Sequence, residues 1–269
     1  MVCIWMATGF ALASFVAGWV SGDYSWIDRL WSTLPVGFVW YYAARADFEW
    51  RSLLVAGLVT LWGARLTFNF ARKGGYGKTE DYRWAYMRSV IPNPVLWQAF
   101  NLLFICAYQA GMFVLFTLPA FVLWEHRGRS FQWLDALAIL LFLAFLAIET
   151  VADQQQWAFQ ERKRRGERGS GDLERGFLAS GLFRFSRHPN FFGEMGIWWA
   201  VYLFSVSVTG AWFLNVGILG AVMLTLLFQG STGLTEKLSK KKYPAYGEYQ
   251  KRTSRLIPWF SKGMGEKAS

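Results

Sequence analysis

Charged and polar side chains gather in residues 181–194, which read GLFRFSRHPNFFGE and stand directly before an apolar run. Pro189 suits the first turn of a helix, because the amide hydrogen that proline lacks would have no partner there. The other free N–H groups of a helix start attract phosphate, and arginine binds phosphate through two hydrogen bonds. The stretch therefore predicts a phosphate or pyrophosphate site, completed by its basic side chains Arg184, Arg187 and His188.

Two more polar residues follow in the same predicted helix. Asn190 and Glu194 are four residues apart, so they share one helix face and could hydrogen-bond a single ligand. A second interpretation has equal weight on spacing alone. In it, Arg187 and His188 anchor the helix among lipid headgroups.

Two carboxylates form a second cluster, at the end of an apolar run. Glu149 and Asp153 are also four residues apart and share a helix face. Carboxylates this close to hydrocarbon are costly unless they face a wet cavity or pair with cations. They could accept hydrogen bonds from ribose hydroxyls or an amide, or they could neutralise Arg184 and Arg187.

Aromatic and basic residues interleave in residues 234–260. This composition suits a segment that lies on the membrane surface. It could equally fold over a nucleotide, with Tyr246 or Tyr249 stacking on it. Arg252 or Arg255 would then bind phosphate.

An acid and a base stand within two apolar runs near the amino terminus. Asp28 and Arg65 could simply neutralise each other as a buried ion pair. Alternatively they could line a substrate cavity, where a desolvated and protonated acid polarises a carbonyl group. Each interpretation has about half the weight.

Other common sites are absent from the sequence. It has no Walker loop, no Rossmann G-x-G-x-x-G, and no H-E-x-x-H or G-x-S-x-G motif. Cys3 and Cys106 lie in apolar stretches without a Cys or His partner at zinc-ligand spacing. We therefore expect neither a metal site nor a disulfide.

The composition indicates that these residues are positioned by membrane-spanning helices. Of the 269 residues, 54% are hydrophobic and only 17% are charged. Apolar runs long enough to cross a hydrocarbon core of about 30 Å recur along the chain, and in lipid such runs must be helical. The sequence predicts an all-α integral membrane protein of about seven spans, near residues 2–20, 26–44, 52–70, 95–123, 132–152, 191–208 and 211–229.

The distribution of basic residues predicts the orientation. Residues 71–94 hold five Lys and Arg, residues 161–187 hold eight and residues 236–269 hold nine, against four on the other side. By the positive-inside rule, the amino terminus is outside and the carboxy terminus is cytoplasmic. The formal charge of +10 thus belongs to cytoplasmic loops, some of it meeting anionic lipid, and does not indicate nucleic-acid binding.

These motifs resemble those of the steroid 5α-reductase superfamily, and more closely its bacterial membrane branch of steroid-reductase-like proteins. The resemblance covers most of the chain and is strongest over residues 149–260. It rests on Gly-Leu-Phe before Arg-His-Pro-Asn, on the Asn, Gly and Glu of residues 190–194, and on the ending at residues 249–258. Sterol C=C reductases and isoprenylcysteine-type methyltransferases share a similar Arg-His-Pro signature, so the motif identifies a superfamily better than a reaction.

The resemblance implies a single-domain enzyme of seven helices. Its cofactor half, about residues 131–269, would hold NADPH, and its substrate half, about residues 1–130, would hold a hydrophobic lipid or steroid-like molecule. Hydride would pass to a conjugated C=C bond of that substrate. The positions that match family cofactor contacts are Asp153, Asn190, Glu194, Tyr249 and Arg255, with Arg187 and His188 fitting the same pocket.

Asp28 is the expected catalytic residue. Reduction of an enone needs an electrophile at the carbonyl oxygen, because negative charge develops there. The steroid 5α-reductases use a Glu and a Tyr from their second and third spans, and Asp28 lies in a similar context. No Tyr stands where the third span should provide one, since Trp62 and Gly63 occupy that neighbourhood. This departure weakens the case for 3-oxo-steroids as substrates.

Two other classes of function fit the residues less well. An S-adenosylmethionine-dependent membrane methyltransferase would need a site for a sulfonium and an amino acid moiety, whereas Asp153 and Glu194 suit ribose and amide groups. A noncatalytic lipid-binding or transport protein would concentrate its polar residues near the bilayer midplane. We therefore expect an NADPH-dependent oxidoreductase, located by the resemblance in a bacterial inner membrane.

Overall fold

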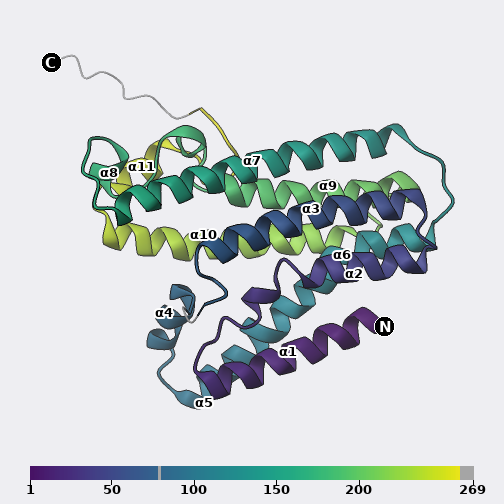
Figure 1. Cartoon of the computed structure of the whole chain (residues 1–269), viewed down its shortest axis with the longest axis horizontal. Coiled ribbons are helices and arrows are strands. Elements are labelled where there is room, and N and C mark those ends of the chain that lie inside the picture. The colour runs from purple at the N-terminus through teal and green to yellow at the C-terminus, as the bar shows by residue number, and fades with distance from the viewer. Residues whose placement is uncertain (78–79, 261–269) are drawn as a thin grey trace. The chain divides into compact units, whose positions relative to one another are not determined.

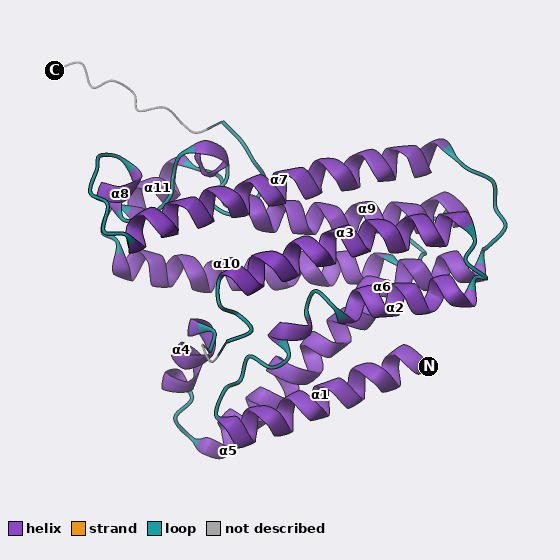
Figure 2. Cartoon of the chain, viewed as in Figure 1, coloured by secondary structure: helices purple, strands orange, loops and turns teal. Residues whose placement is uncertain are grey.

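Helices make up all the regular structure in the computed structural model, which describes residues 1–77 and 80–260. Within these ranges there is no strand, and one isolated β-bridge pairs Ser186 with Ser254. Figure 2 shows the helices joined by loops of varied length. The predicted all-α class is confirmed.

Six helical segments of the described chain are long and apolar enough to cross a membrane. The protein is therefore a multi-pass membrane protein in contact with lipid. Five of these segments are single helices, and the sixth, Pro94–Glu125, combines three helical elements. The single helices in Figure 1 are α1 (Val2–Ser21), α3 (Trp50–Arg72), α7 (Trp133–Arg164), α9 (Pro189–Thr209) and α10 (Ile218–Lys242).

The predicted span at residues 26–44 is the one that differs. It is divided into a single 3₁₀ turn, η1 (Asp28–Leu30), and a 12-residue helix, α2 (Leu34–Arg45). Pro35 stands in the first turn of α2, where proline favours a helix start over continuation of a preceding helix. At 1.5 Å per residue, α2 extends only about 18 Å, too short to cross the hydrocarbon core.

The composite segment contains a change of helix type. It runs from α5 (Pro94–Phe100) through a π-helix, η2 (Asn101–Tyr108), into α6 (Gln109–Glu125). The π-helix is rare and often marks functional sites. Asn101 and Gln109, at its start and just after its end, are both buried.

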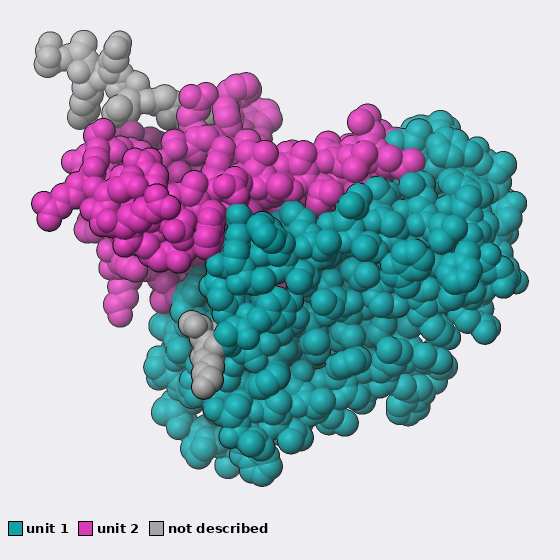
Figure 3. Space-filling model, viewed as in Figure 1, with its two compact units in different colours: residues 1–136, 201–223 teal, residues 137–200, 224–269 magenta. Residues whose placement is uncertain are grey.

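The described chain divides into two compact units, coloured teal and magenta in Figure 3. Unit 1 consists of Met1–Ala136 and Val201–Met223, and unit 2 consists of Leu137–Ala200 and Leu224–Ser269, of which residues up to 260 are described. The expected substrate half, residues 1–130, lies wholly in unit 1. The expected cofactor half is divided, because residues 131–136 and 201–223 belong to unit 1.

A buried ion pair organises one end of unit 1. Arg51, in the first turn of α3, donates from Nε and Nη2 to the two carboxylate oxygens of Asp135, at 3.0 and 2.8 Å. The same guanidinium donates to the carbonyl oxygens of Arg129 and Ser130, at 3.0 and 2.7 Å. Both charged side chains are almost fully buried. The loop before α7 is thus held to the start of α3.

Glycines allow α7 and α9 to approach closely in unit 2. A Cβ atom placed on Gly193 would lie 2.9 Å from the backbone nitrogen of Glu149, and one on Gly196 would lie 2.3 Å from the ring of Phe145. Since no real Cβ tolerates such distances, only glycine fits these positions without a shift of the helices. The first turns of α9 therefore lie directly against α7 at the level of Glu149.

Candidate functional site

Three buried carboxylates lie at the contact of α7 and α9. Glu149, Asp153 and Glu194 expose 2%, 5% and 7% of their surface. Glu149 and Asp153 are one turn apart on α7, and Glu194 follows the glycine that touches Glu149. The acids expected to hold a ligand are therefore buried inside the protein.

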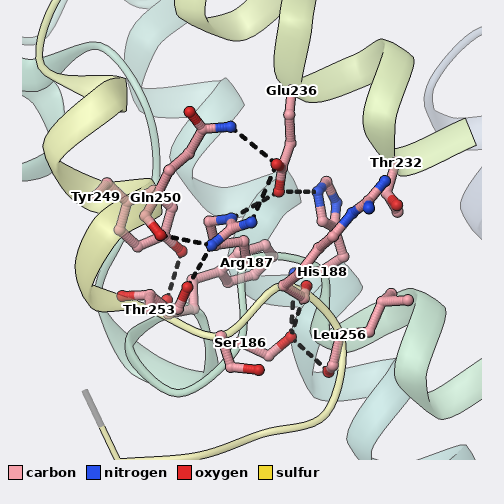
Figure 4. Close-up of polar contacts among 12 residues, drawn as sticks. Ser186, Arg187, His188, Thr232, Glu236, Tyr249, Gln250, Thr253 and Leu256 are labelled. Atoms are coloured by element: carbon pink, nitrogen blue, oxygen red, sulfur yellow. Dashed lines mark hydrogen bonds and ion pairs between the residues drawn. The ribbon is translucent and has the colours of Figure 1, made fainter. Parts of the chain in front are cut away.

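Glu236, on α10, is the centre of a polar cluster beside the start of α9 (Figure 4). Arg187 donates from Nε to its Oε1 at 2.6 Å and from Nη2 to its Oε2 at 3.0 Å. His188 Nε2 lies 3.1 Å from Oε1, and Gln250 Nε2 donates to Oε2 at 2.8 Å. Three side chains from two segments thus converge on one buried carboxylate.

Arg187 also holds the carboxy-terminal segment. Its Nη1 donates to the carbonyl oxygen of Gln250 at 2.9 Å and to that of Thr253. Every nitrogen of the guanidinium therefore has a partner within the protein. The structure places Arg187 in an internal ion pair that uses four of its five guanidinium N–H donors.

Backbone and hydroxyl contacts continue this attachment. Arg187 N donates to Ser254 O at 2.8 Å, and Ser186 Oγ donates to Leu256 O at 2.7 Å. Further along, Trp259 N donates to Phe185 O at 2.9 Å. Residues 253–259 therefore lie alongside residues 185–187, which lead into α9.

The other basic residues of the predicted site differ in their surroundings. Arg184, in the 3₁₀ helix η3 (Gly181–Arg184), is exposed, and its guanidinium lies 4.8 Å from the centroid of the Phe185 ring. Arg255 donates from Nη2 to Gln229 O. Its Nε is buried and has no hydrogen-bond partner within residues 1–77 and 80–260. Arg255 therefore has a buried donor that no group of the described residues satisfies.

Tyr249 is held by the protein itself. It lies in the short helix α11 (Tyr246–Arg252), and its hydroxyl donates to Phe183 O at 2.5 Å. Its ring packs against Phe177, with centroids 5.4 Å apart, and Tyr246 packs on the same ring. Burial raises the pKa of Tyr249 well above its ordinary value. Both tyrosines thus fix the fold of the tail in this structure.

Asn190, in the first turn of α9, is half-buried.

Asp28 lies in unit 1, in η1, and has two neutral partners. Trp84 Nε1, from α4 (Tyr82–Val90), donates to Oδ2 at 2.6 Å, and the side chain of Gln109 hydrogen-bonds the same carboxyl group. Burial raises the pKa of Asp28, and the positive charge of Arg83 only partly opposes this effect. A raised pKa favours the protonated acid.

Glu236 and Gln250 were not among the predicted site residues. The signal in the sequence was slight: Thr232 and Glu236 are four residues apart and both are buried on α10. Nothing in the local pattern pairs Glu236 with Arg187, 49 residues earlier. Among the described residues, no group of three or more His, Cys, Asp or Glu side chains could hold a metal ion.

Comparison with known proteins gives a family and one curated relative. Residues 14–253 match the family described as "Protein of unknown function (DUF1295)". An uncharacterized protein of the fission yeast Schizosaccharomyces pombe is 38% identical over 250 residues, which cover 87% of this chain and 72% of the yeast protein. No solved structure matches the chain.

Proposed function

The chain belongs to the DUF1295 family, and from the chemistry of its buried polar residues we propose that it is a membrane reductase of the steroid 5α-reductase superfamily. It uses NADPH to reduce a C=C bond conjugated to a carbonyl group in a hydrophobic substrate. The cofactor is held by unit 2. Asp28, in unit 1, is the electrophile.

One observation carries the proposal: the carboxylates of α7 and α9 are turned inward. Glu149, Asp153 and Glu194 are all buried in unit 2. Acids at the end of a membrane helix that only tethered the protein would reach outward to water and headgroups. Buried acceptors at this spacing suit the ribose hydroxyls and the carboxamide of a nicotinamide dinucleotide.

Two groups of hydrogen-bond donors in unit 2 also fit such a cofactor. The phosphates of the dinucleotide need cationic or N–H donors, and the buried Nε of Arg255 and the first turn of α9 supply them. Arg187 already pairs with Glu236, so in our proposal it stabilises the site without contacting the cofactor. When bound, the cofactor supplies the hydride; the protein binds it and excludes water.

Asp28 acts on the substrate. Its protonated carboxyl group donates a hydrogen bond to the carbonyl oxygen of the enone, where negative charge develops as the C=C bond is reduced. Trp84 and Gln109 keep the carboxyl group in one orientation. The enolate then takes one proton. Either Asp28 protonates its oxygen, regains a proton from solvent and the enol tautomerises to the saturated ketone, or solvent protonates the α-carbon directly and Asp28 keeps its proton.

The first test is thermal stability in detergent with and without NADPH. At a concentration of 100 times Kd, a ligand stabilises the folded protein by about 2.7 kcal/mol, so the melting temperature should rise by several degrees. Glu194→Ala should abolish this rise without changing membrane insertion. Glu248→Ala, at an exposed position of α11, is the matched control and should keep it.

Two results would overturn the reductase proposal. One is a melting temperature that NADPH leaves unchanged while S-adenosylmethionine raises it, which would favour a methyltransferase. The other is full nucleotide stabilisation of Glu194→Ala, which would remove Glu194 from the site.

A further inference from the structure

Arg187 joins three parts of unit 2. It belongs to the segment that leads into α9, it pairs with Glu236 of α10, and it donates to two carbonyl oxygens of the carboxy-terminal segment, those of Gln250 and Thr253. Its side chain is only 8% exposed. A buried arginine that uses four of its five N–H donors on these chain segments acts mainly to join them.

Glu236 makes the contacts of this junction interdependent, so that they form or are lost together. Its carboxylate receives Arg187, His188 and Gln250 together, and it is buried. Removal of one member of a buried ion pair leaves the other charge without compensation, which costs far more than the loss of a neutral hydrogen bond. The junction should therefore be lost as a whole when Glu236 is removed.

The tail depends strongly on this junction. Beyond α11, residues 253–260 form no helix. Their other backbone contacts to the segment before α9 are neutral hydrogen bonds, each a modest net contribution. Arg255 lies two residues beyond Thr253, whose carbonyl oxygen Arg187 holds, so the junction fixes the position of Arg255.

We propose that Glu236 is a positioning residue: through Arg187 it fastens the carboxy-terminal segment to the start of α9 and so holds Arg255 where it contacts the bound nucleotide. The nucleotide part of this inference rests on the proposed function, whereas the fastening of the tail does not. Glu236 itself does not touch the cofactor. Its effect on binding passes entirely through the tail.

The first measurement follows the tail alone, without nucleotide. Trypsin should cleave the Arg255–Leu256 bond slowly in the native protein, since Leu256 is buried and its carbonyl oxygen accepts a hydrogen bond from Ser186. In Glu236→Ala, release of the peptide that begins at Leu256, followed by mass spectrometry, should be about 10²-fold faster, because the open form becomes more populated.

A matched control separates a loosened tail from general instability. Asp135→Ala breaks the other buried arginine–carboxylate pair, that of Arg51 in unit 1. It should lower the melting temperature by a similar amount without accelerating cleavage after Arg255. If Glu236→Ala does not fold, Glu236→Gln retains its shape and should accelerate cleavage by about 10-fold, because the neutral amide keeps one acceptor oxygen and replaces the other with a donor. Cleavage of the Glu236 variants within about 3-fold of the control's rate would overturn the proposal.

The second measurement adds NADPH. In the wild type, saturating NADPH should slow the same cleavage, and in the Glu236 variant about 10-fold more NADPH should be needed for half the protection. A freed tail with unchanged NADPH affinity would overturn the positioning role and leave the reductase proposal intact. Absence of any NADPH effect on the wild type would refute the reductase proposal and the nucleotide part of this inference, while the cleavage rates would still decide whether Glu236 fastens the tail.

Discussion

Two buried arginine–carboxylate pairs, one in each unit, have the same local geometry and different neighbours. Arg51 and Arg187 each bind a carboxylate through two nitrogen atoms, and each donates to two backbone carbonyl oxygens of a loop or tail. In both cases the arginine joins a helix start to a second segment, the loop before α7 for Arg51 and the end of α11 with Thr253 for Arg187. We call such an arginine–carboxylate pair, together with the two carbonyl groups that the arginine also binds, a staple.

The partners of the two carboxylates differ. Asp135 receives Arg51 and the backbone N–H of Gln132, at 2.9 Å. Glu236 receives Arg187, a histidine and a glutamine, and it lies in the unit that also buries Glu149, Asp153 and Glu194. A pair that only fixes a loop needs no further side chains. In our proposal, the additional partners of Glu236 belong to the support of the cofactor site.

The largest effect should come from breaking the simpler staple. Arg51→Ala leaves Asp135 buried without its counter-charge, which should lower the free energy of unfolding by about 3–5 kcal/mol. Thermal unfolding in detergent measures this, and NADPH should still raise the melting temperature of the surviving protein. Arg127→Ala, at an exposed position of the same loop, should have little effect. Equal effects of the two substitutions would show that burial of the pair is unimportant.

A second substitution tests the close helix contact behind the carboxylates. Gly193→Ala places a methyl group 2.9 Å from Glu149 N and must push α9 away from α7, at a cost of about 1–3 kcal/mol. It should also weaken NADPH binding, because Glu194 moves with the helix. Gly230→Ala, where nothing lies within 4 Å of the added atom, should be neutral or slightly stabilising. Normal NADPH binding by the Gly193 variant would contradict the proposed role of unit 2 in holding the cofactor.

Substitution of arginine by lysine at both staples sharpens the comparison. Lysine keeps the charge but cannot bind both carboxylate oxygens and two carbonyl groups at once, so we expect a loss of about 1–2 kcal/mol from Arg51→Lys and from Arg187→Lys. Only Arg187→Lys should also change cleavage after Arg255. The same melting experiment and the tryptic assay measure both effects. Tail release in the Arg51 variant would argue that the two staples are not independent.

The smallest effect concerns Asp172, in the short helix α8 (Asp172–Arg175). Burial opposes its ionisation, but hydrogen bonds from Ser180, Arg175 and Ala179 N outweigh it and lower the pKa of the carboxyl group. Its contribution to stability is therefore complete above its unfolded pKa of about 3.9 and is lost as the pH falls through the lower folded value. Asp172→Asn should cost about 1 kcal/mol at neutral pH.

The measurement for Asp172 is the difference in melting temperature between the wild type and the variant. This difference should be constant from neutral pH down to about pH 5 and should shrink below about pH 4. Glu174→Gln, at an exposed neighbouring position, is the control and should match the wild type throughout. A difference that grows on acidification would contradict the sign derived from the lowered pKa.

The fold was largely predictable because apolar length is a local property. Six of the predicted spans correspond to long helices in the described chain, and the exception at residues 26–44 depends on the break before Pro35. Helical spacing also predicted that Glu149 and Asp153 share one helix face, and both are buried on α7. Each of these features can be read from one stretch of sequence.

The side-chain partnerships were not predictable in the same way. Arg187 was expected to contact a ligand, and its pairing with Glu236 joins residues 49 positions apart. Asp28 was expected either to pair with Arg65 or to line a substrate cavity, and its carboxyl group hydrogen-bonds the indole of Trp84 and the side chain of Gln109. Which of several nearby groups satisfies a buried charge depends on packing, and packing is not encoded in spacing.

The π-helix between α5 and α6 implies a sensitivity to chain length that the regular helices lack. An α-helix advances by about 100° per residue and a π-helix by less, so the same eight residues wound as an α-helix would rotate everything after them. Gln109 would then turn away from Asp28. Loss of one residue from 101–108 could restore α-helical winding and keep this orientation, whereas insertion of a residue could not, so this segment should tolerate shortening better than lengthening.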